Sequence, residues 1–278
     1  MTKREILITL PSFEKDLVIT LDSKKKCAYC DATENFTKEH IFPASIIKTY
    51  TTEMRSINDK IDHDFQGDLV IGDVCATCNN GALSKLDASF IKTFKSQMAE
   101  PLNPGDEVVF EFDYDLLLRE LLKISYNSAR ASKNGYDAKV ILEKHVPYIL
   151  TGSGKISGTI VSLQIVTSAN ATIQETGESL GMMKPYLLRS ASVEGLNLNP
   201  KNYITRMVAF NSFWFYLLIP KRSVTSAIKN DFWKEFKSKT HLHGVLLKKG
   251  VESIKITKDK TTYLHIDLIE KMRRKTKR

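Results

Sequence analysis

The sequence contains no long hydrophobic run, and its opening residues lead us to expect no secretory leader. Its longest apolar-leaning stretch, residues 207–220, is interrupted by Asn211 and Ser212 and is shorter than the roughly 20 residues that cross a bilayer. Residues 6–11 lack both the length and the small-residue cleavage site of a signal peptide. We therefore expect a cytoplasmic protein without a membrane partner. Thiols stay reduced in that compartment, so its cysteines suit metal binding or catalysis better than disulfides.

Acidic residues are few at one end of the chain. Residues 221–278 contain 17 Lys and Arg against 6 Asp and Glu, and this region accounts for the net charge of +9 because the rest of the chain is close to neutral. A basic block attracts polyanions by neutralising phosphates and releasing counterions. The charge predicts a nucleic acid as partner. The alternative is a solvated tail, ending in residues 271–278, that only aids solubility.

Repeats and low-complexity tracts are also absent, apart from the basic terminus. The pattern predicts an α+β protein with a boundary at Pro101, Pro104 and Gly105, so that residues 1–100 form one domain and residues 105–278 form an α+β domain with a mostly antiparallel sheet. We expect helices over residues 44–50, 79–98, 116–133, 138–150 and 226–239, a polar loop over 51–66, and extended segments over 6–10, 17–21, 67–74, 108–112, 159–166, 203–210, 213–219 and 263–268.

Cysteine is scarce, and the four cysteines fall into two matched pairs. Cys27 and Cys30 form one C-x₂-C knuckle, Cys75 and Cys78 form another, and 44 residues separate the two. A knuckle directs two thiolates at one ion, and two knuckles complete a tetrahedral zinc site. The separation is longer than in an ordinary zinc ribbon, so the intervening segment must hold something of its own. The alternative is a set of redox-active or merely buried cysteines.

The residues around these pairs resemble a known family. Residues 39–43 read Glu-His-Ile-Phe-Pro, and Asn79, Asn80 and Gly81 follow the last cysteine directly. The order C-x₂-C, then (Asp/Glu)-His-Ile-x-Pro, then C-x₂-C-Asn at a helix start resembles the zinc-bearing HNH endonucleases. A Cys-Asn-Asn step followed by a downstream acidic residue, here Asp87, is similar to one branch of that family. The resemblance covers about residues 25–95, a third of the chain.

The resemblance implies a ββα-metal fold in which zinc on the four cysteines is structural, His40 ends the first strand and Asn79 begins the helix. His40 would be the general base, a role that suits an unperturbed pKa of about 6.5. Glu39 and Asn79 would hold a catalytic Mg²⁺ or Mn²⁺, since carboxylate and amide oxygens are ligands for a hard ion. Asn80 is the fallback ligand, and Asn79 could instead be a helix N-cap.

One family position is not matched. The middle Asn of the family, which normally orients the loop carrying the histidine, has no clear counterpart; Asp68 lies nearest in character, and Asp68 or Asp73 could substitute. Three further histidines, His63, His241 and His243, are interpreted as solvated or surface residues. The aromatic run at residues 213–216 is interpreted as core packing rather than as a platform for bases.

The leading interpretation of the resemblance is a metal-dependent endonuclease acting on DNA rather than RNA, in a restriction, phage-defence or mobile-element system. One alternative is a non-catalytic zinc-containing protein that binds nucleic acid through its basic C-terminus. Another is a nuclease effector in which residues 105–278 respond to a small-molecule activator or a protein partner.

Overall fold

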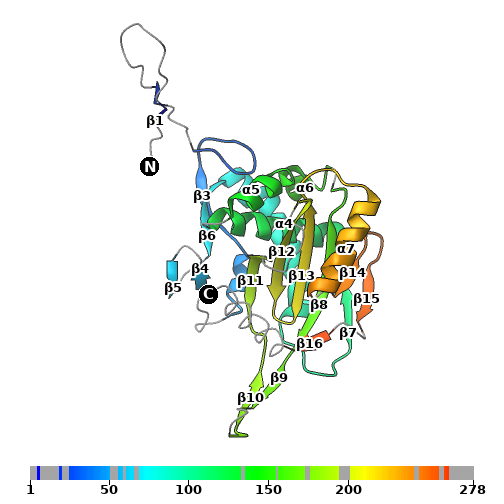
Figure 1. The fold of residues 1–278 in the computed structure, drawn as a ribbon. Helices are drawn as coiled ribbons and strands as arrows, with labels where there is room; N and C mark the ends of the chain where they lie inside the picture. The colour runs from blue at the N-terminus through cyan, green and yellow to red at the C-terminus, as the bar shows by residue number, and fades with distance from the viewer. Residues whose placement is uncertain are drawn as a thin grey trace.

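The fold is mixed α+β, and its strand pairs are mostly antiparallel (Figure 1). The computed structural model describes residues 5–6, 19–20, 25–50, 56–58, 61–65, 69–132, 135–154, 156–172, 176–193, 201–240, 244–256 and 260–262. The predicted fold class is therefore confirmed at this level. No helix in these parts of the chain has the length and apolar character needed to cross a membrane.

The largest sheet has the strand order β11-β12-β13-β8-β14, and β16 pairs in parallel with β8. The strands are β8 (Ile160–Thr167), β11 (Leu188–Ser192), β12 (Tyr203–Phe210), β13 (Phe213–Pro220), β14 (Val245–Leu247) and β16 (Lys260–Thr262). β12 and β13, both expected as extended segments, form a hairpin with Phe210 opposite Phe213. The turn uses Asn211 at a positive φ of 48°, which Asn tolerates better than most residues.

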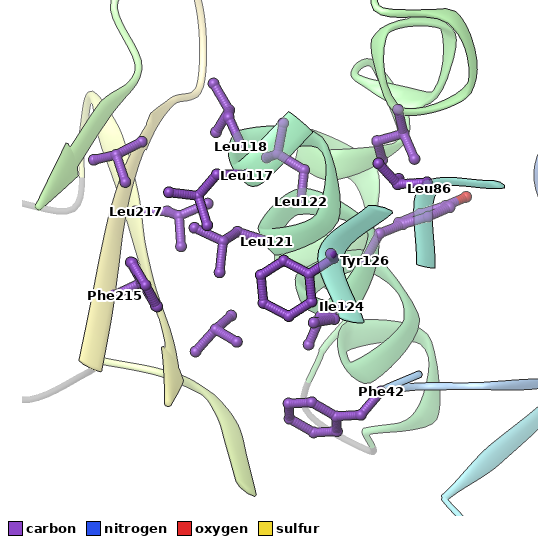
Figure 2. Packing of buried hydrophobic residues seen from close by; sticks show 14 of the residues in the cluster. Phe42, Leu86, Leu117, Leu118, Leu121, Leu122, Ile124, Tyr126, Phe215 and Leu217 are labelled. Carbon is purple, nitrogen blue, oxygen red and sulfur yellow. The ribbon is translucent and has the colours of Figure 1, made fainter. Parts of the chain in front are cut away.

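Both faces of this sheet are covered, because alternate residues of its central strands enter two hydrophobic clusters. Helix α7 (Ser226–Thr240) covers one face and contributes Phe232 and Phe236 to its cluster. Helix α4 (Tyr114–Ala131) lies on the other face (Figure 1). Figure 2 shows Leu121 of α4 beside Phe215 of β13. The helix α4 is therefore central to the core.

The cysteine-rich region is built from two strands and a helix. Strand β3 (Phe36–His40) pairs antiparallel with β6 (Val70–Cys75), with His40 opposite Val70. A continuous helix begins directly after β6. Its consecutive segments are α2 (Ala76–Cys78), the π-helical η1 (Asn79–Leu83), α3 (Ser84–Thr93) and the π-helical η2 (Phe94–Met98).

The remaining elements are short or flank the core. The helices are α1 (Ala44–Ile47), α5 (Tyr136–Glu143) and α6 (Val146–Thr151). The strand pairs are β1 (Glu5–Ile6) with β2 (Ile19–Thr20), β4 (Ser56–Asn58) with β5 (Ile61–Phe65), β7 (Val108–Glu111) with β15 (Ser253–Ile256), and β9 (Ala169–Thr172) with β10 (Ser179–Met183). Helices α5 and α6 pack on α4 beside the cysteine-rich region (Figure 1).

One hydrophobic cluster continues across residues 101–105. The ring of Phe210, in β12, lies 5.7 Å from that of Phe42, 5.0 Å from that of Phe90 and 5.9 Å from that of Phe94. The three partners belong to the N-terminal part of the chain, and α3 also packs on α4. The division into residues 1–100 and 105–278 stays a prediction, and the two parts share a core.

Two predicted helices differ from the observed ones. The helix expected over 79–98 begins at Ala76, because the chain turns directly from β6 into the helix within the second cysteine pair. The helix expected over 138–150 is two helices, α5 and α6. Pro147 stands in the first turn of α6, where its missing N–H is tolerated, whereas inside one long helix it would remove a hydrogen bond.

Short strands were the other source of error. The segment 51–66 was expected to be a loop, but its described residues form β4 and β5. Strands β9, β10, β11, β14, β15 and β16 were not predicted, since three to five residues give too little alternation to distinguish them from loops. The extended segment expected over 263–268 lies outside the described residues.

Candidate functional site

The four cysteines come together at the end of β6. Their Sγ atoms all lie within 4.8 Å of one another, and the Sγ atoms of Cys30 and Cys75 are 3.5 Å apart. A tetrahedral zinc with Zn–S bonds of about 2.3 Å places its sulfurs about 3.8 Å apart, so the four cysteines Cys27, Cys30, Cys75 and Cys78 could hold one such ion. Among the described residues, a search for three or more Cys, His, Asp or Glu side chains close enough to share one metal ion finds this group.

Local backbone geometry forms each knuckle. In the first pair, Asp31 takes a positive φ of 60°, and its N–H donates to the carbonyl of Cys27. In the second pair, Cys75 ends β6 and Cys78 lies in the first helical turn, which brings two thiols to one side. The N–H of Cys75 also donates to Cys27 Sγ over 3.3 Å. The two knuckles are therefore joined by backbone as well as by their sulfurs.

The electrostatics of the cluster favour a cation. Burial opposes ionisation of Cys75, but hydrogen bonds from the Cys78 N–H and from the neighbouring thiols lower the pKa of Cys75 to about 7. Burial raises the pKa of Cys78. Four thiolates this close repel one another, and a divalent ion would neutralise them.

The end of β3 carries the two residues predicted to perform chemistry. His40 is the last residue of the strand and is half-buried, whereas Glu39 is 3% exposed. Burial raises the pKa of Glu39, and the nearby Lys123 ammonium opposes that rise. The Lys123 Nζ lies 3.0 Å from Glu39 Oε1. Glu39 is therefore half of a buried ion pair.

Asn79 joins the helix to this strand. Its Nδ2 donates to Thr37 Oγ1 over 2.9 Å and to the Lys38 carbonyl over 3.0 Å, and both acceptors belong to β3. The helix begins at Ala76 with Cys75 before it, so the alternative role of Asn79 as an N-cap is wrong. With the nitrogen engaged, Oδ1 is the atom of Asn79 that could bind a cation.

Helix α4 supplies charged residues to the site that the sequence analysis missed. Lys123 is fully buried, and besides Glu39 its ammonium lies 2.5 Å from Asp87 and 3.7 Å from Glu120. Burial raises the pKa of Glu120 well above its usual range. We call Lys123, Glu39, Asp87 and Glu120 the lysine cluster. Glu120 and Lys123 are three residues apart on a helix, a spacing that places them on one face. The spacing does not indicate that Glu39 and Asp87 contact that face.

Asn127 continues that face one turn further. Its Nδ2 lies 3.3 Å from the His40 carbonyl and 3.5 Å from Glu39 Oε1, while its Oδ1 accepts from the Tyr29 hydroxyl over 2.6 Å and from Arg130 over 2.9 Å. No motif in the sequence marks this residue. The available signal was an asparagine four residues after Lys123, one helical turn further along the same expected helix.

The other candidate residues lie elsewhere. Asp73 pairs with Arg130 over 3.4 Å, and its carbonyl accepts from the Ala28 N–H, so it supports the first knuckle. Asn80 is exposed. His63 is described only as backbone of β5, and Asp68, His241 and His243 fall outside the described residues. The aromatic run at 213–216 is buried, as predicted.

Comparison with known proteins adds no identification. No family model matches the sequence, no curated protein matches it, and no solved structure matches the fold. The geometry of the cysteine cluster and of its neighbouring side chains therefore carries the functional argument.

Proposed function

We propose that the protein is a metal-dependent endonuclease of the HNH type, with structural zinc on the four cysteines and His40 as general base. One observation carries the proposal: Asn79, directly after the last cysteine, donates to the Lys38 carbonyl, two residues before His40. Asn79 thus fastens the helix, next to the cysteine cluster, to the end of β3. This arrangement agrees with the ββα-metal layout that the motif order implies.

In this reading each residue has one task. His40 removes a proton from the attacking water, which histidine does efficiently near neutral pH. Asn79 Oδ1 and Glu39 Oε2 are the oxygens that suit Mg²⁺ or Mn²⁺, since the closest contacts of the Glu39 carboxylate engage Oε1. A cation bound there would stabilise negative charge on the phosphate and the leaving oxygen. Lys123 helps to keep the buried Glu39 ionised and so able to act as a ligand.

DNA is the substrate we propose, in a defence, restriction or mobile-element setting. Helix α7 presents exposed lysines, among them Lys234, Lys237 and Lys239, within the basic region 221–278. Such charges bind phosphates without reading sequence. They would add affinity rather than specificity, and competition between DNA and RNA substrates of equal length would test the preference.

A second candidate is a zinc-containing protein that binds nucleic acid without cutting it. The burial of Glu39 and its pairing with Lys123 favour this reading, because they give the carboxylate a structural partner. Under this hypothesis the basic C-terminal region would be the binding surface. The two candidates differ in whether a divalent cation changes the nucleic acid.

The test is nicking of supercoiled plasmid with Mg²⁺ or Mn²⁺ by the full chain. We expect wild-type nicking that EDTA abolishes, and a loss of at least about 100-fold in His40→Ala. His145→Ala, which removes a histidine between α5 and α6, is the matched control and should retain activity. Equal nicking by His40→Ala would contradict the role of His40. Salt-dependent DNA binding without nicking would favour the second candidate.

A further inference from the structure

We propose that Asn127 of α4 is the positioning residue that holds the strand end carrying Glu39 and His40. The inference rests on the proposed nuclease function and assigns to the site a residue from outside the predicted nuclease domain, residues 1–100. Asn127 is fully buried and acts through other groups rather than on the substrate.

The amide nitrogen of Asn127 donates at the point where β3 ends. It lies 3.3 Å from the carbonyl oxygen of His40 and, in a longer contact, 3.5 Å from Glu39 Oε1. The strand pairing ends with His40 opposite Val70. The His40–Ile41 peptide is held from both sides, because Asn127 donates to its carbonyl and its Ile41 N–H donates to the Leu69 carbonyl over 2.8 Å. This peptide adjoins the Cα atom from which the imidazole projects. A shift of about 1 Å in such a group can cost about 100-fold in rate.

The orientation of the Asn127 amide is determined by its neighbours. Arg130 can only donate, so the atom that it contacts at 2.9 Å must be Oδ1. The His40 carbonyl can only accept, so the atom facing it must be Nδ2. The Tyr29 hydroxyl adds a second donor to Oδ1 at 2.6 Å. A flipped amide would oppose donor to donor and acceptor to acceptor.

These contacts connect the strand end to the zinc knuckle. Tyr29 stands between Cys27 and Cys30, and its ring packs edge-on against Tyr126, the residue before Asn127. Arg130 in turn pairs with Asp73. Asn127 therefore links the position of the first cysteine pair to the proposed catalytic residues. In the family, the middle Asn performs this orienting role, and that Asn has no clear counterpart here.

The experiment compares Asn127→Asp with Asn211→Asp in the full, zinc-loaded chain. Aspartate keeps the shape and the acceptor oxygen of Asn127, and replaces the donor that faces the His40 carbonyl with a second acceptor. Asn211 is a matched control because it is also fully buried. It accepts from the Tyr50 hydroxyl and donates to the carbonyls of Met98 and Ala99.

For Asn127→Asp we expect kcat for plasmid nicking to fall by about 10- to 100-fold, with KM within about twofold of wild type and zinc content unchanged. The ¹⁵N signals of the His40 imidazole should also shift, a readout that does not require activity. Asn211→Asp should leave kcat and the His40 signals unchanged.

Wild-type kcat and wild-type His40 signals in folded Asn127→Asp would overturn the inference. If that variant does not fold, Tyr29→Phe decides, because it removes only the hydroxyl that orients Oδ1. It should lower kcat at least about threefold, and an unchanged kcat would overturn the inference. If wild type itself does not nick DNA, the nuclease proposal fails, and the His40 signals then test the positioning role alone.

Discussion

Replacing Lys123 with methionine should destabilise the fold more than the loss of an ordinary ion pair. The Lys123 ammonium is fully buried and lies 3.0 Å from Glu39, 2.5 Å from Asp87 and 3.7 Å from Glu120. Methionine keeps an unbranched side chain but has no charge. We expect Lys123→Met to lower the free energy of unfolding by about 3–5 kcal/mol at pH 7, because it leaves carboxylates buried without a cation.

The magnitude follows from how well each carboxylate can reach water. The side chain of Glu39 is 4% exposed and that of Asp87 is 19% exposed, so Glu39 loses more when the cation is removed. Glu120 is fully buried, burial raises its pKa, and at 3.7 Å it lies farthest from the ammonium. The closer contacts, with Glu39 and with the partly solvated Asp87, therefore determine most of the penalty.

The penalty should grow with pH. Burial raises the folded-state pKa of both Glu39 and Glu120. The stability that each contributes is fully present below its unfolded pKa and is lost as pH rises through the folded value. Removing Lys123 removes a group that lowers both pKa values, so the variant would lose more stability between pH 5 and pH 8 than the wild type does.

The assay is urea unfolding followed by circular dichroism at pH 5, 7 and 8 with zinc in excess. Lys239→Met is the matched control, because Lys239 lies 2.8 Å from Glu235 while 38% exposed, and its loss should cost less than about 1 kcal/mol. Equal costs for the two variants, or a Lys123→Met deficit that shrinks as pH rises, would refute the reasoning.

Two further predictions concern the metal and the core. Elemental analysis should find about one zinc per chain, retained against Mg²⁺ dialysis, and Cys78→Ser or a chelator should lower both zinc content and Tm, because metal binding contributes to folding. Phe210→Ala should lower the free energy of unfolding by about 3–5 kcal/mol, because its ring packs against Phe42, Phe90 and Phe94. Separate unfolding transitions for residues 1–100 and 105–278 would contradict a shared core.

Local patterns made the cysteine cluster predictable. A C-x₂-C pair depends on a few consecutive residues, so Cys27 with Cys30, and Cys75 with Cys78, could be identified from spacing alone. The hairpin at Asn211 was predictable for the same reason, since a two-residue turn connects adjacent strands. In both cases the sequence separation of the interacting residues is small.

Contacts between distant segments were not predictable. The helical spacing of apolar residues in the sequence reveals the apolar face of α4. Lys123 and Asn127 are polar residues of the same helix that are also buried, which this spacing does not predict. Nothing along the chain indicates that Asn127 meets Glu39, a residue 88 positions away. The helix start was also missed, because Cys75 is not among the residues favoured before a helix and Asn79 is.

Helix geometry explains how one element can serve both the lysine cluster and the zinc knuckle. Lys123, Asn127 and Arg130 follow one another at four and three residues, so they lie along one stripe about 10 Å long. Lys123 contacts Glu39, Asn127 contacts the His40 carbonyl and Tyr29, and Arg130 contacts Asp73. A rigid stripe of this length fixes the strand end relative to the first cysteine pair, which two flexible loops could not do as accurately. The opposite side of α4 packs on the large sheet, so the sheet determines where the stripe stands.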